Sequence, residues 1–387
     1  MRSVLMSKFV PWPANSGEKR RTLAIARALK TLGDVTICGF LGTNEEVEGL
    51  VQEGFDVRAV PLARSWGKTI PGLAKGKSLS AARFWDPAFA QQVTEATAEP
   101  YDVLVVEHVQ FQMYAPADSK AYTVVDMHNI ESSLAERVSS TKTGPLKAVY
   151  AVDAAALTRL EKQALTADTV LVVSDADKAV LETESRRPNV RVVPNGWDPT
   201  EALPTTDTPV VSFVALLSWG PNVDAAVWFT TKVWPLVTAA LPEAHLQLVG
   251  REPAPEVRAL ASASVEVTGT VAELDPWYEK TLVAVAPLLA GGGSRLKILE
   301  GLAAGRPIVA TTIGAEGLED LVGDGVVVAD EPARMADEIV ALLRDPATTH
   351  ALGAQGARAV AERHSWEAAV EPLLSAITKS GIAVTSA

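Results

Sequence analysis

Apolar residues in the first half of the chain gather in short runs, and amphipathic segments separate these runs. One such segment, EKRRTLAIARALKTLG at 18–33, has the spacing of a helix that buries one face. The apolar runs predict strands buried on both faces, and they are RSVLMSKFV (2–10), DVTICGF (34–40), FDVRAV (55–60), YDVLVVEH (101–108), YTVVDMHN (122–129) and DTVLVVS (168–174). Strands of this kind that alternate with helices indicate a parallel sheet.

The same pattern restarts after VVPNGWDPTEALPTTDTP at 192–209, which is rich in proline, threonine and aspartate. A helix is predicted across 222–241, and the strand-like runs of this half are VVSFVALLS (210–218), HLQLVG (245–250), VEVTG (265–269), LVAVAPL (282–288), PIVAT (307–311) and VVVAD (326–330). The sequence therefore predicts an α/β protein with two doubly wound Rossmann-like domains, 1–200 and 201–365. Residues 366–387 contain a further amphipathic helix, which we expect to pack back on the first domain.

Length and composition fit this picture. A chain of 387 residues is too long for one ordinary core, and 48% hydrophobic with 21% charged residues is typical of a globular protein. The formal net charge of -12 argues against nucleic acid as a partner. The single cysteine, Cys38, lies in a strand-like run and favours a reducing compartment. Without a leader or a run of about 18 apolar residues, we expect a soluble cytoplasmic protein.

One stretch, residues 58–85, departs from the acidic balance of the chain. It holds no acidic residue, and its basic and aromatic residues are Arg58, Arg64, Trp66, Lys68, Lys75, Lys77, Arg83, Phe84 and Trp85. Such side chains suit an anionic lipid surface or a phosphate-bearing acceptor. A loop with solvated charges is the alternative, since Pro71 and the glycines break any long amphipathic helix. The first interpretation would give the protein a weak peripheral membrane contact through 58–85, and the sequence leaves both interpretations open.

The strand-to-helix junctions are the places where open α/β sheets bind ligands. At one junction the strand LVAVAPL at 282–288 is followed by the turn GGGS and the helix RLKILEGLAA at 295–304. Free backbone N–H groups and the positive end of a helix dipole would then form an anion site that suits a phosphate. The alternative is a flexible turn followed by a surface ion pair between Lys297 and Glu300.

Two standard phosphate loops are absent from the sequence. No GxxxxGK[ST] occurs, and the first domain's turn, PWPANSGEKRR at 11–21, is not GxGxxG. Kinases, ATPases and nicotinamide dehydrogenases are correspondingly disfavoured.

The stretch PLLAGGGSRLKILEGLAAGRPIVATTIGAEGLE at 287–319 closely resembles the donor-binding segment of retaining GT-B glycosyltransferases of family 4. The resemblance is greatest to a branch with a GGG[ST]RLKILE core, which includes bacterial sugar transferases of exopolysaccharide systems. Three more stretches agree in order and spacing, namely VVDMHNIES (124–132), VVPNGWD (192–198) and PNVDAAVWFTTKVWP (221–235). Together these motifs span most of the chain.

This resemblance implies a retaining hexosyltransferase that moves a sugar from a nucleoside diphosphate sugar to an acceptor hydroxyl. The donor would bind mainly to the second domain and transfer would occur in the cleft between the domains, without a metal ion or another cofactor. The acceptor, a small molecule, a lipid-linked group or a glycan, would bind to the first domain. The leaving phosphate would itself accept the proton of the acceptor, because no carboxylate stands out as a nucleophile.

The resemblance also assigns residues to the donor. Glu300 would bind the ribose hydroxyls, while the Gly292 and Gly293 amides, Ser294 and Lys297 would hold the diphosphate. Hydrogen-bond donors aimed at the leaving oxygens would supply much of the catalysis.

Three more residues follow from the matched motifs or from strand ends. His128, in DMHN, falls where the family often has a histidine near the transferred sugar, and Gly17 lies in the loop that borders donor and acceptor. His128 could equally be a core histidine, with Asp126 and Glu131 either orienting it or lying on the surface. Glu316 either closes the nucleotide pocket or caps a helix.

The sequence departs from the family's pattern at two places. Many members have a glutamate eight positions before the one that matches Glu300, and here Gly292 stands there. Many members also carry a GR…K pair that holds the diphosphate, whereas this chain has VALLSWGPN at 214–222. Our hypothesis is that Arg295 and Lys297 supply the missing positive charge and act in catalysis.

These departures keep a second function class open. A non-catalytic partner or sensor could retain the fold and bind the nucleotide sugar without transferring the sugar. An epimerase or phosphorylase would need a carboxylate acid/base set or a lysine-bound pyridoxal phosphate, and the sequence shows neither signature.

Overall fold

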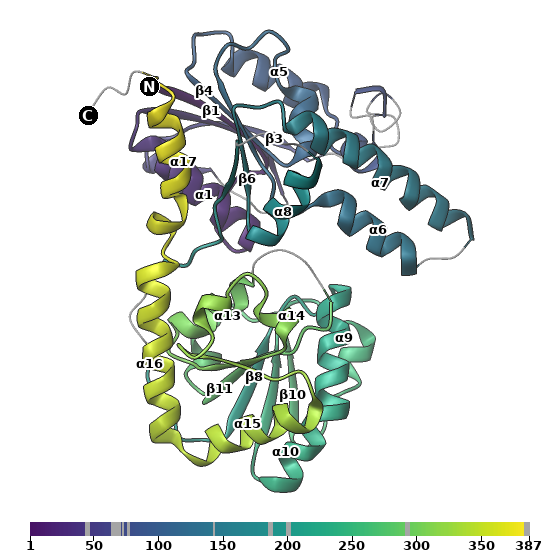
Figure 1. Ribbon diagram of the computed structural model, residues 1–387, viewed down its shortest axis with the longest axis vertical. Helices are drawn as coiled ribbons and strands as arrows, with labels where there is room; N and C mark the ends of the chain where they lie inside the picture. The colour runs from purple at the N-terminus through teal and green to yellow at the C-terminus, as the bar shows by residue number, and fades with distance from the viewer. Residues whose placement is uncertain are drawn as a thin grey trace. The chain divides into compact units, whose positions relative to one another are not determined.

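The computed structural model describes residues 1–42, 47–62, 71, 73–75, 78–141, 144–184, 189–198, 203–290 and 295–382. Two compact units make up the chain (Figure 1). Unit 1 is Met1–Pro194 with Ala369–Ala387, and unit 2 is Asn195–Ala368.

Unit 1 is built on a seven-stranded sheet in the order β3-β2-β1-β4-β5-β6-β7, and each paired strand runs parallel to its neighbour. The strands are β1 Arg2–Phe9, β2 Asp34–Leu41, β3 Asp56–Pro61, β4 Val103–Glu107, β5 Tyr122–Asp126, β6 Thr169–Val172 and β7 Val190–Val192. The register pairs Glu107 with Asp126. Because parallel strands end at the same edge of the sheet, these two acidic residues lie side by side at the carboxyl ends of β4 and β5.

Helices cover the two faces of this sheet (Figure 1). They are α1 Gly17–Lys30, α2 Glu48–Gln52, α4 Leu79–Ala82, α5 Pro87–Ala96, the 3₁₀ helix η1 Val109–Tyr114, α6 Glu131–Thr141, α7 Gly144–Ala164 and α8 Asp175–Glu184. Helix α1 begins at Gly17 because Ser16 caps it, with the Ser16 hydroxyl accepting a hydrogen bond from the Lys19 amide. Glu18 follows in the first turn, where the helix dipole favours a negative charge.

Unit 2 is built on a six-stranded parallel sheet in the order β10-β9-β8-β11-β12-β13. Its strands are β8 Val210–Val214, β9 His245–Val249, β10 Val265–Gly269, β11 Val283–Ala286, β12 Ile308–Ala310 and β13 Val326–Val328. Two parallel sheets, each flanked by helices, confirm the predicted fold class. Of the strands within the described residues, the sequence pattern missed β7, which is three residues long and has an exposed residue, Arg191, at its centre.

The helices of unit 2 include one correction to the sequence prediction. They are α9 Gly220–Trp228, the π-helical turn η2 Phe229–Val233, α10 Trp234–Ala240, α11 Pro255–Arg258, α12 Asp275–Tyr278, α13 Leu296–Ala303, α14 Thr312–Ala315, the 3₁₀ helix η3 Glu319–Leu321, α15 Pro332–Arg344 and α16 Pro346–Arg363. The single helix predicted across 222–241 is interrupted by η2. The interruption precedes Pro235, which has no N–H to donate to the preceding turn.

The last helix, α17 Trp366–Lys379, belongs to unit 1 from Ala369 onward (Figure 1). Its apolar face is buried, with Val370, Leu373 and Ile377 at 5% exposure or less. Among the described residues, no helix combines the length and apolar character that crossing a membrane requires.

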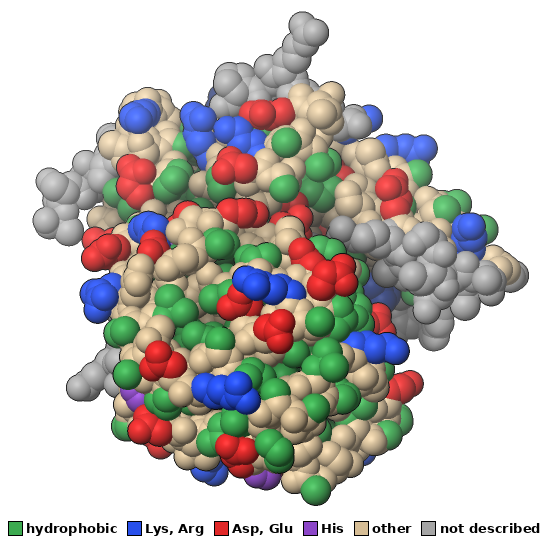
Figure 2. All heavy atoms as spheres, turned by 60° about the horizontal axis from the view of Figure 1, so that its bottom comes forward, with side chains coloured by type: hydrophobic (Ala, Val, Ile, Leu, Met, Phe, Trp, Pro, Cys, Tyr) green, Lys and Arg blue, Asp and Glu red, His purple; other side chains and the backbone are tan. Residues whose placement is uncertain are grey.

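Each unit has its own apolar core, and a few ionisable side chains, such as Arg21, Glu107 and Asp126 in unit 1, are also buried. Cys38 is fully buried, as predicted, and burial raises the pKa of its thiol to about 12. On the face drawn in Figure 2, acidic and basic side chains are interspersed among apolar ones.

Candidate functional site

The predicted donor loop is only partly within the described residues. Gly292, Gly293 and Ser294 lie outside them. Helix α13 follows directly, with Arg295 at its N-cap position and Leu299 and Leu302 buried beneath it. At this site, the structure therefore shows the positions of Arg295 and of the α13 side chains.

Lys297 reaches from α13 to the carboxyl end of β8. Its Nζ donates a hydrogen bond to Asn222 Oδ1 at 2.7 Å and lies 5.1 Å from the centre of the Phe213 ring. Asn222, in α9, is itself held by a hydrogen bond from its Nδ2 to the Leu216 carbonyl. The Lys297 ammonium thus lies beside the stretch 214–222, where the family's cations are missing.

The surroundings of Lys297 lower the pKa of its ammonium group. Burial, and then the charge of Arg295, lower the pKa of its ammonium from 10.5 to about 7. The hydrogen-bond partner Asn222 is neutral, so it does not compensate the positive charge of Lys297 as a carboxylate would. An anionic ligand would restore the charged form.

Arg295 contacts the turn after β12 and not the end of β8. Its Nε and Nη2 donate to the Ile313 carbonyl at 3.1 and 3.0 Å, and Nη2 lies 3.1 Å from Glu316 Oε2. Glu316 ends the short helix α14 that follows β12. The structure therefore brings two predicted residues together, because the buried Arg295 forms an ion pair with the exposed Glu316. This ion pair holds the turn after β12.

Apolar side chains are exposed along the same edge of the unit 2 sheet. They follow β8, β11 and β12 and are Leu216, Trp219, Leu289 and Ile313. Glu300 lies one turn after Lys297 on α13 and is partly buried. The carboxyl edge of this sheet thus offers the Lys297 ammonium, the Glu300 carboxylate and an apolar surface.

His128, in unit 1, follows β5 and is almost completely buried. Its Nε2 lies 3.1 Å from Asp126 Oδ2 and 4.0 Å from Glu107 Oε1. Burial, and then the charge of His108, lower the pKa of His128 to about 4, and Asp126 only partly opposes this. His128 is therefore a neutral imidazole at neutral pH.

Asp126 is held by Arg21, which comes from α1. The Arg21 Nε and Nη2 donate to the two carboxylate oxygens at 2.8 and 2.6 Å, and its Nη1 donates to the Val193 carbonyl at 2.6 Å. Burial alone would raise the pKa of Asp126, but the Arg21 charge lowers it below its usual value. The alternative that Asp126 lies on the surface is wrong, because it is fully buried.

Two functional candidates escaped the sequence analysis, His108 and Glu18. The rings of His108 and His128 have centres 4.2 Å apart, and His108 Nε2 lies 3.1 Å from Glu18 Oε1. Glu18 also pairs with Lys8 at 3.1 Å. His108 has φ of +62°, a conformation that non-glycine residues rarely adopt and that is common at functional sites. It follows β4 as His128 follows β5, so the strand-end rule could have found it.

Gly17 lies at the start of α1, one residue before Glu18. Burial would raise the pKa of Glu18, but the hydrogen bond with His108 and the charges of His108 and Lys8 lower it. Gly17 is thus the first residue of the helix that carries Glu18 into the cluster formed by Glu18, His108, His128, Glu107 and Asp126, and not part of the preceding loop.

Three atoms of this cluster have the spacing of a metal-ligand set. Single ligand atoms from Glu107, Asp126 and His128 lie within 4.8 Å of one another. However, the Arg21 guanidinium already occupies both oxygens of Asp126. A cation placed among these atoms would lie next to this positive charge, which disfavours metal binding.

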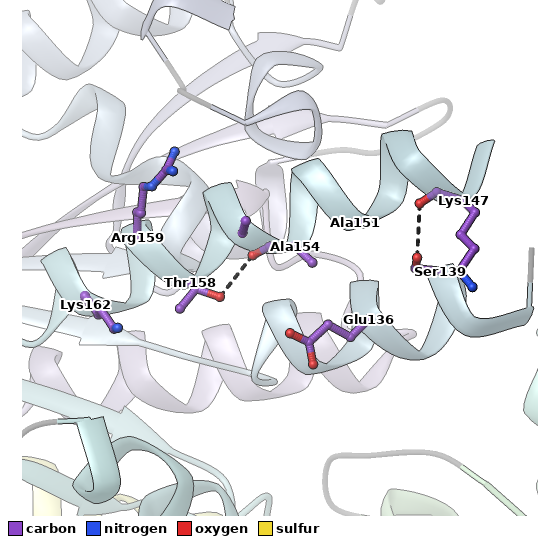
Figure 3. Close-up of a pocket in the computed structure, with 9 residues that line it drawn as sticks. Glu136, Ser139, Lys147, Ala151, Ala154, Thr158, Arg159 and Lys162 are labelled. Atoms are coloured by element: carbon purple, nitrogen blue, oxygen red, sulfur yellow. Dashed lines mark hydrogen bonds between the residues drawn. The ribbon is translucent and has the colours of Figure 1, made fainter. Parts of the chain in front are cut away.

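A separate groove of about 580 Å³ lies between α6 and α7 in unit 1 (Figure 3). Alanines of α7 line it together with Glu136 of α6 and with Lys147 and Lys162 of α7. None of the predicted site residues that the structure describes lines this groove.

The basic stretch 58–85 lies only partly within the described residues, since Arg64, Trp66, Lys68 and Lys77 are outside them. Its described members make contacts within unit 1. Arg58 lies 3.2 Å from Asp56, Lys75 lies over the ring of Trp85, and Trp85 stacks on Tyr114.

Comparisons with known proteins agree with this architecture. Residues 16–196 match the family described as glycosyl transferase 4-like domain, and residues 208–345 match glycosyl transferases group 1. The two matches fall on units 1 and 2 and together include most of the chain.

Relatives of known sequence match parts of the chain. One is D-inositol 3-phosphate glycosyltransferase 1 of Catenulispora acidiphila, 40% identical over 114 residues, which are 28% of this chain and 26% of that protein. Another is an uncharacterized 44.6 kDa protein in the cps region of Klebsiella pneumoniae, 27% identical over 139 residues, which are 34% of this chain and 36% of that protein. The matched segments therefore span only about a quarter to a third of these relatives.

Solved structures match over nearly the whole chain. A sucrose-phosphate synthase of Thermosynechococcus elongatus is 18% identical with a TM-score of 0.69, and the match covers 98% of this chain and 97% of that one. HepE of Anabaena, solved in complex with UDP-glucose, is 14% identical with a TM-score of 0.66 and coverage of 98% and 100%. Similarity at these identities shows the fold. With the two family matches, it leads to one conclusion: the chain belongs to the glycosyltransferases of the GT-B fold.

Proposed function

We propose that this protein is a retaining hexosyltransferase that moves a sugar from a nucleoside diphosphate sugar to an acceptor hydroxyl. The position of Lys297 is the observation that carries this proposal. Its ammonium lies at the carboxyl end of β8 on Asn222, beside the N-terminal turn of α9. Folds of this kind bind ligands at the carboxyl ends of their parallel strands. The desolvated Lys297 ammonium is hydrogen-bonded to the neutral Asn222 side chain rather than to a carboxylate, which favours binding of a diphosphate.

The remaining donor contacts belong to the same proposal. Glu300 binds the ribose hydroxyls, and the Gly292 and Gly293 amides with Ser294 complete the diphosphate cradle. Trp219, which is exposed beside the same strand ends, offers an apolar face to the donor. Arg295 acts indirectly in this scheme, because its hydrogen bonds to Ile313 and its ion pair with Glu316 hold the neighbouring turn.

The chemistry follows from charge development. The bond between the sugar C1 and the diphosphate oxygen breaks as the bond from C1 to the acceptor oxygen forms on the same face, and the acceptor proton passes to the leaving diphosphate. Negative charge therefore grows on the diphosphate, where Lys297 and the loop amides stabilise it. His128 contacts the transferred sugar, and unit 1 binds the acceptor.

A panel of UDP-, GDP- and dTDP-sugars tests this function. We expect one donor to raise the melting temperature, since binding to the folded state stabilises it by mass action. That donor should be hydrolysed slowly without acceptor, and the anomeric configuration of a transferred sugar, read by NMR, should be retained. Activity should persist in EDTA.

Each negative outcome has its own meaning. No stabilisation by any donor contradicts the proposal. Stabilisation without hydrolysis or transfer to any acceptor favours the non-catalytic sensor. Inverted configuration contradicts the retaining mechanism, and loss of activity in EDTA contradicts its independence of metal.

A further inference from the structure

His108 is held at the carboxyl end of β4 in a strained backbone conformation. Its φ is +62°, its N–H donates to the Asp126 carbonyl at 2.8 Å, and its own carbonyl accepts from the Phe111 N–H at 3.0 Å. Such conformations cost energy and persist where the surrounding structure enforces them, often at functional sites. The backbone therefore fixes where the imidazole ring lies.

One nitrogen of this ring is already engaged. Nε2 lies 3.1 Å from Glu18 Oε1, and Glu18 Oε2 in turn lies 3.1 Å from the Lys8 ammonium. A carboxylate has only acceptors, so Nε2 carries the proton of the hydrogen bond with Glu18. Glu18 and Lys8 thus hold the ring through Nε2 and leave Nδ1 for another partner.

The other nitrogen of the ring faces a gap. Nδ1 has no hydrogen-bond partner among the described residues and is not one of their fully buried atoms that lack one, so it is accessible to solvent. Glu131 Oε1, in the first residue of α6, lies 4.0 Å from it, and this side chain is 19% exposed. The distance is too long for a direct hydrogen bond, but one oxygen atom about 2.8 Å from each of them can bond to both.

Hydroxyl groups match both sides of this gap. The Glu131 carboxylate only accepts, so a ligand must give it a proton, whereas Nδ1 donates when the ring is charged and accepts when the ring is neutral. A single hydroxyl serves a charged ring, because its oxygen accepts from Nδ1–H while its proton goes to Glu131. The two hydroxyls of a diol serve a neutral ring. A phosphate offers almost no proton at neutral pH, and the negative charge of Glu131 repels it.

We propose that His108 and Glu131 bind a hydroxyl group of the acceptor, and that the acceptor presents a polyol such as a sugar here rather than a phosphate. The inference rests on the proposed glycosyl transfer, in which His128 contacts the transferred sugar. The centres of the His108 and His128 rings are 4.2 Å apart, so a hydroxyl bound at His108 lies next to that sugar. His108 and Glu131 orient the hydroxyl and gain no proton overall, because the acceptor proton passes to the leaving diphosphate. Glu18 is a positioning residue that acts through His108.

The first test needs no glycosyl transfer. Protein labelled with ¹⁵N-histidine is titrated with the methyl glycosides of glucose, galactose, mannose and N-acetylglucosamine, with and without UDP, GDP or dTDP. The His108→Gln variant assigns the His108 signals by their loss. We expect at least one glycoside to shift the Nδ1 signal of His108 saturably, while the exposed His245 and titrations with inorganic phosphate show no shift. No shift with any glycoside, or a shift with phosphate alone, overturns the proposal.

Variants then identify the contacts that hold the glycoside. Glu131→Gln loses the carboxylate, so the glycoside concentration at half-saturation should rise about tenfold, the value of one hydrogen bond. Glu136→Gln, at an exposed position further along α6, is the matched control and should bind as the wild-type protein does. Unchanged binding by Glu131→Gln overturns the proposal, and so does an equal loss in Glu136→Gln.

His108→Gln separates the two nitrogens in the transfer reaction. A glutamine amide can reach Glu18 from the position of Nε2 but leaves the position of Nδ1 empty. The KM for the acceptor should therefore rise about tenfold while the Kd for the donor stays unchanged. An equal loss of donor affinity would place the ring at the donor and overturn the proposal. If His108→Gln does not fold, Glu131→Gln and Glu136→Gln decide through the same two constants.

The two levels of the account fail separately. A glycoside that shifts the His108 signal but is never glycosylated contradicts the proposed transfer and leaves this binding site in place. Transfer whose acceptor KM is unchanged in both His108→Gln and Glu131→Gln contradicts the binding site and leaves the proposed transfer in place.

Discussion

At the scale of single residues, the ammonium of Lys297 determines how donor binding depends on pH. Its pKa of about 7 in the free protein lies well below 10.5, and a bound diphosphate would favour the charged form. Donor binding above pH 7 must therefore take up a proton, and affinity should fall about tenfold per pH unit above that value. Isothermal titration calorimetry from pH 6.5 to 9 measures this slope.

Lys297→Arg is the matched control, because a guanidinium stays charged throughout this range. Its affinity should be nearly independent of pH, and equal slopes in both proteins would show that another group titrates. The same shift affects folding. Between pH 7 and 10.5 the unfolded chain binds more protons at Lys297 than the folded chain does, so this residue's contribution to stability rises with pH.

Some of these residues are visible in the sequence and others are not, for physical reasons. A residue at a strand end is visible in the sequence, and this rule found His128. The hydrogen bonds that give the two sites their properties join residues far apart in the sequence, since Arg21 and Asp126 are separated by 105 positions and Lys297 and Asn222 by 75. No local pattern reports such pairs, so the neutral His128 and the low pKa of Lys297 could not be predicted.

At the scale of secondary-structure elements, Arg21 joins α1 to the end of β5 and to the segment that leaves unit 1 at Val193. Arg21→Leu leaves the buried Asp126 carboxylate without its partner, so the free energy of unfolding should fall by about 3–5 kcal/mol. Arg27→Leu is the control on the same helix, because Arg27 pairs with Glu53 at the surface and should cost at most about 1 kcal/mol. Urea unfolding compares them, and equal losses would contradict this role of Arg21.

Helix α17 provides a second test at this scale. Leu373 is fully buried, so Leu373→Ala should destabilise the protein by about 2–5 kcal/mol through lost burial and the cavity it leaves. Glu371, two residues earlier, is exposed, and Glu371→Ala should change stability by no more than about 0.5 kcal/mol. Thermal and urea unfolding measure both, and a Leu373→Ala variant as stable as the control would show that α17 contributes little to the core.

The sequence predicted the type of these elements more successfully than the breaks within them. Short apolar runs that alternate with amphipathic helical segments are typical of parallel strands, so the two sheets followed from the sequence. The break in the helix across 222–241 did not, because Pro235 is tolerated in the first turn of a helix and the pattern showed one continuous face.

At the scale of the whole molecule, the division into two units predicts where a donor acts. Each unit has its own sheet and core, and the proposed contacts with the nucleotide and its diphosphate belong to unit 2, while His128 of unit 1 is proposed to contact the sugar. Saturating donor, at about 100 times Kd, stabilises the state that binds it by about 2.7 kcal/mol. Hydrogen exchange should therefore slow around α13, β8 and α9, while β1 to β3 stay unchanged. Protection confined to unit 1 would contradict the assignment of the donor to unit 2.

The central claim is that Lys297 holds the diphosphate of a nucleotide sugar. The most direct measurement is calorimetric titration of UDP, GDP and dTDP into the wild-type protein and Lys297→Ala at pH 7, with Lys280→Ala of the same unit as control. We predict that one nucleotide binds the wild-type and Lys280→Ala proteins equally. Lys297→Ala should bind it roughly 10- to 100-fold more weakly, as expected for a lost hydrogen bond to a charged group. Equal binding by Lys297→Ala, or no binding of any nucleotide to the wild-type protein, would contradict the claim.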